Sequence, residues 1–169
     1  VVEYILKRGH DVQLHVHPNY LNFTLDDPTE VRFSDLIGNY DLERQIEIIG
    51  EARHSLESYG ALNVKAFRAG CFGANELTLK ALEANGFTID SSYNASFLEG
   101  PCLFKIGGSI NQPIVINGIL ELPITNFTEH SYIRPRRLMP LDINGVGFEE
   151  IRYVLLKAYS YGIQFVTII

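Results

Sequence analysis

Cysteine is scarce in this sequence, and so is positive charge. The chain has two cysteines, Cys71 and Cys102, which are too few for a disulfide framework. Its net charge of -6 argues against a nucleic-acid partner, because a surface that binds nucleic acid is basic. Arg134, Arg136 and Arg137 form one local basic patch, and a solvated loop accounts for it.

Long hydrophobic runs are missing as well. No stretch is long and apolar enough to span a bilayer, so the sequence predicts no membrane span. Hydrophobic residues make up 46% and charged residues 20% of the chain, which is ordinary globular usage. A chain of 169 residues is long enough to bury the core of one domain.

The chain also lacks an initiator methionine and a polar end. Residues 1–8 have the pattern of a helix interior, and residues 165–169 form an apolar run typical of a buried strand. A bare apolar strand end would be an aggregation hazard. We therefore expect residues 1–169 to be a single incomplete domain from a longer protein. A targeting signal would precede Val1, so the sequence indicates no localisation.

Helical and strand patterns alternate along the chain. Helices are predicted at residues 1–8, 42–59, 75–85 and 148–161. Strands are predicted at residues 12–17, 63–67, 87–90 and 163–169, with a hairpin at 114–122. Long loops are predicted at residues 18–41 and 123–147. This alternation predicts an α/β fold with a parallel sheet, either open and doubly wound or closed into a barrel.

Two histidines end the first predicted strand. Side chains alternate along a strand, so His15 and His17 should point to the same face. Two imidazoles on one face can hold a divalent metal ion such as Zn, Co, Ni or Mn. A purely structural histidine pair would have the same spacing.

The next two predicted strands also end in polar residues. Arg68 follows the second strand and Asp90 ends the third. Parallel α/β folds place their chemistry beyond the carboxyl ends of the strands, so we expect both residues on the rim that carries His15 and His17. Taken alone, Arg68 also fits a structural ion pair, and Asp90 fits a turn or cap.

Three segments carry a family resemblance. They are GHDVQLH at residues 9–15, FRAGCFG at 67–73 and LKALEANGFTIDSS at 79–92. Together they resemble the polysaccharide deacetylases, the NodB-homology group within family 4 of the carbohydrate esterases, over about half of the chain.

The resemblance implies a fold, a reaction and a set of roles. The fold would be a distorted (β/α) barrel, similar to a TIM barrel and incomplete here. The reaction would be metal-dependent removal of N-acetyl or O-acetyl groups from a polysaccharide or lipid-linked sugar. His15 and His17 would bind zinc, Arg68 would orient the aspartate base, and Asp90 would support the acid histidine or the pocket wall.

The chain departs from the family pattern at several positions. The usual second zinc histidine would stand at Asn19, but it lies at His17 in an HxHP element. This element resembles a branch associated with bacterial lipopolysaccharide and other surface-glycan biosynthesis, which would favour the cytoplasm. Ala69 replaces the usual proline. The base and acid motifs are expected outside residues 1–169, so these residues alone should bind metal weakly and show little activity; His130 is not assigned as the acid.

Three alternatives remain open at the level of sequence. The chain could be a non-catalytic glycan-binding relative of the same fold. It could be a zinc amidohydrolase that acts on a non-sugar amide. The histidine pair could also be structural. The sequence does not identify the sugar or the oligomeric state.

Overall fold

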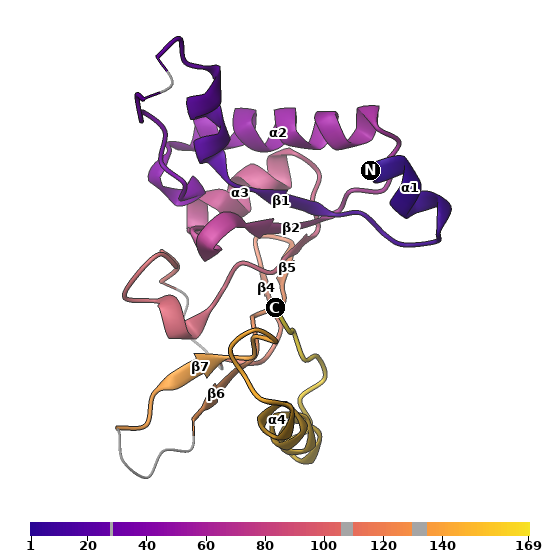
Figure 1. Cartoon of the computed structure of the whole chain (residues 1–169), viewed down its shortest axis with the longest axis vertical. Coiled ribbons are helices and arrows are strands. Elements are labelled where there is room, and N and C mark those ends of the chain that lie inside the picture. The colour runs from indigo at the N-terminus through magenta and orange to yellow at the C-terminus, as the bar shows by residue number, and fades with distance from the viewer. Residues whose placement is uncertain (28, 106–109, 130–134) are drawn as a thin grey trace.

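A five-stranded sheet forms the centre of the protein (Figure 1). The computed structural model describes residues 1–27, 29–105, 110–129 and 135–169. The strands are β1 (Leu14–Val16), β2 (Ala66–Ala69), β3 (Ile89–Asp90), β4 (Ile114–Ile116) and β5 (Ile119–Glu121). Their order is β1-β2-β3-β5-β4, with every neighbouring pair parallel except β4 and β5. The predicted α/β class with a mostly parallel sheet is confirmed.

The sheet is open in the part of the chain that the structure describes. Strands β1 and β4 lie at its two edges and do not pair with each other. A closed barrel is therefore not seen among the described strands, and the barrel stays a prediction.

The predicted helices are all present. They are α1 (Val2–Lys7), α2 (Leu42–Ser58), α3 (Glu76–Ala84) and α4 (Phe148–Ser160). Local signals explain their bounds. Asp41 accepts a hydrogen bond from the Arg44 N–H at the start of α2, and Asn75 forms a capping box with Thr78 at the start of α3. Gly60 follows α2 with φ of +95°, a left-handed conformation that ends a helix at little cost for glycine.

The main core lies between the sheet and helices α2 and α3, which pack against each other (Figure 1). Leu14 and Val16 of β1 and Phe67 of β2 are buried in this core. Because strand side chains alternate, His15 and Arg68 point to the opposite face. The sheet thus separates a buried face, which packs on α2 and α3, from a face that carries His15 and Arg68.

Short 3-10 helices fill the connections. They are η1 (Pro18–Thr24), η2 (Ile37–Asn39), η3 (Gly70–Phe72) and η4 (Ala95–Phe97). The predicted hairpin at 114–122 is confirmed, with positive φ at Asn117 and Gly118 as a tight turn between β4 and β5 requires. No helix among the described residues is long and apolar enough to cross a membrane.

The C-terminal part differs from the prediction. Strands β6 (Asn126–Thr128) and β7 (Leu138–Pro140) form an antiparallel pair where a loop was predicted. Beside this pair lies α4, and a second small core cluster contains Leu141, Val146 and Val154 (Figure 1). Of the basic patch, Arg136 and Arg137 are exposed, whereas Arg134 lies outside the described residues.

The predicted last strand is wrong. Residues 163–169 have no strand assignment, and Phe165 is 50% exposed. The segment runs beside the second cluster, where Ile169 donates its N–H to the Leu141 carbonyl and Thr167 accepts from the Thr125 N–H. An apolar run indicates that a segment packs against other residues. It does not show that the segment does so as a strand of a sheet.

Candidate metal centre

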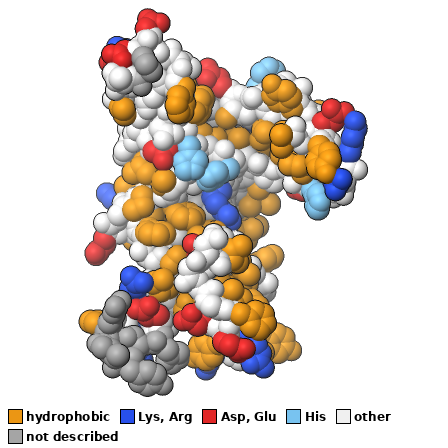
Figure 2. Space-filling view, in the orientation of Figure 1, with side chains coloured by type: hydrophobic (Ala, Val, Ile, Leu, Met, Phe, Trp, Pro, Cys, Tyr) orange, Lys and Arg blue, Asp and Glu red, His pale blue; other side chains and the backbone are white. Residues whose placement is uncertain are grey.

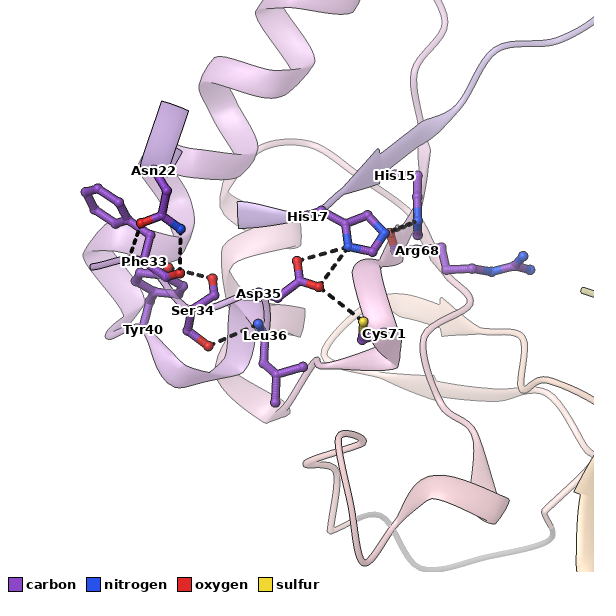
Figure 3. A network of polar contacts seen from close by, with 10 residues as sticks. All are labelled: His15, His17, Asn22, Phe33, Ser34, Asp35, Leu36, Tyr40, Arg68 and Cys71. Atoms are coloured by element: carbon purple, nitrogen blue, oxygen red, sulfur yellow. Dashed lines mark hydrogen bonds and ion pairs between the residues drawn. The ribbon is translucent and has the colours of Figure 1, made fainter. Parts of the chain in front are cut away.

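His15 and His17 come together at the end of β1 (Figure 3). Leu14 and Val16 are buried on either side of His15, so its side chain faces away from the core. His17 follows the strand directly and precedes Pro18, which begins η1. The Nε2 atoms of the two rings lie 3.1 Å apart, and the ring planes are 84° from each other. The prediction that the two imidazoles share a face is confirmed.

Hydrogen bonds to the other ring nitrogens fix where the protons lie. The Nδ1 atom of His15 lies 2.9 Å from the backbone carbonyl oxygen of Arg68, which can only accept. The Nδ1 atom of His17 lies 2.9 Å and 3.1 Å from the two carboxylate oxygens of Asp35. Both Nδ1 atoms therefore donate. In the neutral rings, both Nε2 lone pairs face each other, an arrangement that a cation between them would satisfy.

The surroundings of His15 favour its neutral form. Burial is the largest cause that lowers the pKa of His15, and the charges of His17 and Arg68 act in the same direction. The hydrogen bond to the Arg68 carbonyl opposes this shift. A neutral imidazole is the form that binds a metal ion, so this environment prepares His15 as a ligand.

Two further donor groups lie beside His17. Asp35, in the loop before η2, also accepts a hydrogen bond from the Cys71 thiol, with Sγ 3.2 Å from Oδ2. The donor atoms of His17, Asp35 and Cys71 lie within 4.8 Å of one another, so this group could in principle hold a metal ion. The Asp35 contact is the largest cause that raises the pKa of the Cys71 thiol.

Neither Asp35 nor Cys71 was predicted as a site residue. Asp35 stands in a long loop with no spacing that marks it, although long loops in compact domains often serve a function. Cys71 belongs to FRAGCFG, the segment that contributed to the family resemblance. The position of Cys71 in this segment was the one feature of the sequence that could have marked it as a site residue.

The backbone after β2 fits closely around His17. A Cβ atom at Gly70 would lie 2.5 Å from Nδ1 of His17, so only glycine allows this approach. The next two residues, Cys71 and Phe72, have φ of +52° and +58°. Residues other than glycine rarely adopt this left-handed region, and such strain collects at functional sites. The segment places the Cys71 thiol against Asp35 at a cost in backbone energy.

Arg68 is next to the pair but points away from it (Figure 3). It pairs in register with His15 across β1 and β2. Its guanidinium donates from Nε to the Ser91 carbonyl and from Nη2 to the Ser91 hydroxyl, both at 3.1 Å. Burial lowers the pKa of Arg68, while the charges of Asp90 and Glu121 act in the opposite direction. The predicted placement of Arg68 beside the histidines is confirmed for its backbone.

Asp90 does not join the histidine pair, and this part of the predicted rim is wrong. In the register, Asp90 pairs with Phe67 and Glu121, so its side chain shares the buried face of the sheet. The Ser92 hydroxyl donates to it at 2.6 Å. Burial raises the pKa of both carboxyl groups, and for Glu121 the Asp90 charge adds to that shift. The sequence predicted that Asp90 ends a strand. It did not predict the cross-strand register, which determines the face of the sheet on which the Asp90 side chain lies.

Open depressions flank the histidine pair on the surface. One has a volume of about 530 Å³ and is lined by His15, His17, Tyr20 and residues of α2. Another has a volume of about 390 Å³ and is lined by His15, Arg68 and Ser91 among others. Figure 2 shows histidine side chains exposed near the middle of this face. A substrate could therefore approach the pair from solvent.

Comparisons with known proteins add no assignment to this geometry. No protein-family model matches the chain, and no curated protein matches it. The resemblance to polysaccharide deacetylases thus stays a prediction. The structure itself contributes a histidine pair, oriented by a carbonyl and a carboxylate, at a surface that is open to solvent.

Proposed function

We propose that the protein is a metal-dependent hydrolase that removes N-acetyl or O-acetyl groups from a polysaccharide or lipid-linked sugar. His15 and His17 would hold the metal ion, which the resemblance suggests is zinc. The observation that carries this proposal is the 3.1 Å separation of two Nε2 atoms whose rings both donate from Nδ1. Two imidazoles bound to one tetrahedral zinc ion have nitrogen atoms about 3.3 Å apart, given bond lengths of ~2.0–2.1 Å, so the pair fits with a small adjustment.

The neighbours of the pair would orient the ligands. Asp35 accepts from Nδ1 of His17 and the Arg68 carbonyl accepts from Nδ1 of His15, which leaves each Nε2 free to coordinate. Carboxylates and carbonyls in this position fix the ring orientation of metal-binding histidines. A bound zinc ion would supply a water with its pKa lowered to about 7 and would polarise the acetyl carbonyl.

Arg68 would contribute positive charge beside the pair. Its guanidinium is held by Ser91 in the depression of about 390 Å³ that also contains His15. In that position it would attract and orient a carboxylate, which is the role that the resemblance gives it towards the aspartate base. The resemblance also calls for that base and for an acid histidine, and neither role is assigned among residues 1–169. It also expects the open sheet to be part of a (β/α) barrel.

Acetate release tests this proposal. The intact protein, loaded with zinc, is incubated with an N-acetylated oligosaccharide and with small N-acetyl amides. We expect release from the oligosaccharide, and its loss in His15→Ala and His17→Ala. His54→Ala is the matched control, because His54 is exposed on α2, away from the pair in the sequence.

Each of the other outcomes points to a different function. Unchanged release in His15→Ala would mean that the pair is structural. A preference for small amides would indicate an amidohydrolase that acts on a non-sugar substrate. Oligosaccharide binding without acetate release would indicate a glycan-binding protein.

A further inference from the structure

Three donor groups of different chemistry meet on the side of His17 that faces away from His15 (Figure 3). Nδ1 of His17 lies 2.9 Å from Oδ1 of Asp35, and Oδ2 of Asp35 lies 3.2 Å from Sγ of Cys71. The groups come from the end of β1, the loop before η2, and η3, so the fold gathers them from distant parts of the sequence. His15 is not a member of this group.

The local backbone is shaped to bring the thiol to this position. Cys71 and Phe72 both have positive φ although neither is glycine. Gly70 lets the chain pass closer to His17 than any residue with a Cβ atom could. The side chain of Cys71 is exposed, so a dissolved ion can reach it. A strained and closely fitted backbone that presents an accessible thiol suggests a functional use.

We propose that His17, Asp35 and Cys71 bind one thiophilic divalent cation, of the class of Zn²⁺ or Cd²⁺. Imidazole, carboxylate and thiolate are all zinc ligands, and the thiolate favours soft ions over Mg²⁺ or Ca²⁺. The bound ion replaces the thiol proton of Cys71, which leaves to solvent. The proton of the neutral His17 ring moves from Nδ1 to Nε2, so that Nδ1 can coordinate the ion.

This site goes beyond the proposed hydrolase, because it does not use His15. The hydrolase would use Nε2 of His17, and the thiol-containing site uses Nδ1 of the same ring. A cation held by Cys71 therefore removes the Asp35 contact that orients His17 for the other position. A soft metal ion at this site would act as an inhibitor of the hydrolase.

A cobalt titration tests the site by its spectrum. Co²⁺ is added to the reduced protein without oxygen, and the sulfur-to-cobalt charge-transfer band in the near ultraviolet is recorded. We expect the band in the wild type, in His15→Ala and in Cys102→Ser, since Cys102 is buried elsewhere in the core. We expect no band in Cys71→Ser. Asp35→Asn should weaken Co²⁺ binding by more than roughly tenfold, because the loss of a ligand costs more than the tenfold seen when a group that only orients a ligand is lost.

Several results would overturn the proposal. They are Co²⁺ binding to the wild type without the band, a band that persists in Cys71→Ser, and a band that disappears in His15→Ala. Alkylation of Cys71 by iodoacetamide gives a second measurement that needs no variant. Cd²⁺ should protect the thiol in the wild type, and an unchanged alkylation rate would contradict the site. Acetate release is measured in a separate assay. The protein could therefore prove to be a hydrolase that lacks this cation site, or to have the cation site without hydrolase activity, and the two results would be told apart.

Discussion

Gly70→Ala is the sharpest test of the histidine geometry. The added Cβ atom would lie 2.5 Å from Nδ1 and 2.6 Å from Cγ of His17, and 2.7 Å from the Val16 carbonyl oxygen. Ordinary contact begins at 3.4 Å, so the imidazole must retreat by about 0.9 Å. Such a shift breaks the hydrogen bond of 2.9 Å to Asp35. Losing the group that orients a metal ligand costs about 10–100-fold in affinity, and overpacking costs about 1–3 kcal/mol of stability.

Chelator competition for zinc and urea unfolding measure these two effects. Gly145→Ala is the matched control, because a Cβ atom there would meet nothing closer than 4.0 Å. We expect Gly70→Ala to lose zinc affinity and stability together, while Gly145→Ala keeps both. If Gly70→Ala bound zinc as tightly as the wild type and unfolded at the same urea concentration, the close approach to His17 would not exist in solution.

Three further predictions follow from other contacts. Burial raises the pKa of Asp90 and Glu121, so the folded state holds more protons than the unfolded state above the ordinary carboxyl pKa, and stability should fall with rising pH. The fall should continue until the pair ionises, and Glu121→Gln should make it shallower in urea unfolding at successive pH values; an equal slope in both proteins would contradict the buried pair. Asn75→Ala removes the cap of α3 and should cost about 1–2 kcal/mol in thermal unfolding, and an unchanged melting temperature would contradict the cap. Asp35→Asn should reduce zinc affinity about 10–100-fold in a chelator assay, and unchanged affinity would show that Asp35 does not orient His17.

The parts of the structure that depend on near neighbours in the sequence were predictable. Helix α3 followed from its apolar spacing and its cap at Asn75. The meeting of His15 and His17 followed from the alternation of side chains along one strand. These features require no knowledge of how distant segments pair.

The parts that depend on distant pairing were not predictable. The side chain of Asp90 faces the core because Asp90 pairs with Phe67 and Glu121 on the neighbouring strands. No local sequence pattern predicts this register. Asp35 reached His17 because the loop before η2 folds back to the end of β1. The closed barrel and the reaction rest on the family resemblance, and the described residues leave both as predictions.

The parallel pairing of β1 with β2 also governs when His15 gains the contact that orients its ring. The Arg68 carbonyl that orients His15 comes from a strand 53 residues later, and α2 lies in the crossover between the two strands. The chain must close this long crossover before the contact exists, and closing it costs conformational entropy. Metal affinity should therefore appear late in refolding, together with the docking of the two strands. A bound ion would oppose the separation of β1 from β2, because the Arg68 carbonyl orients His15 for binding only while the two strands are paired.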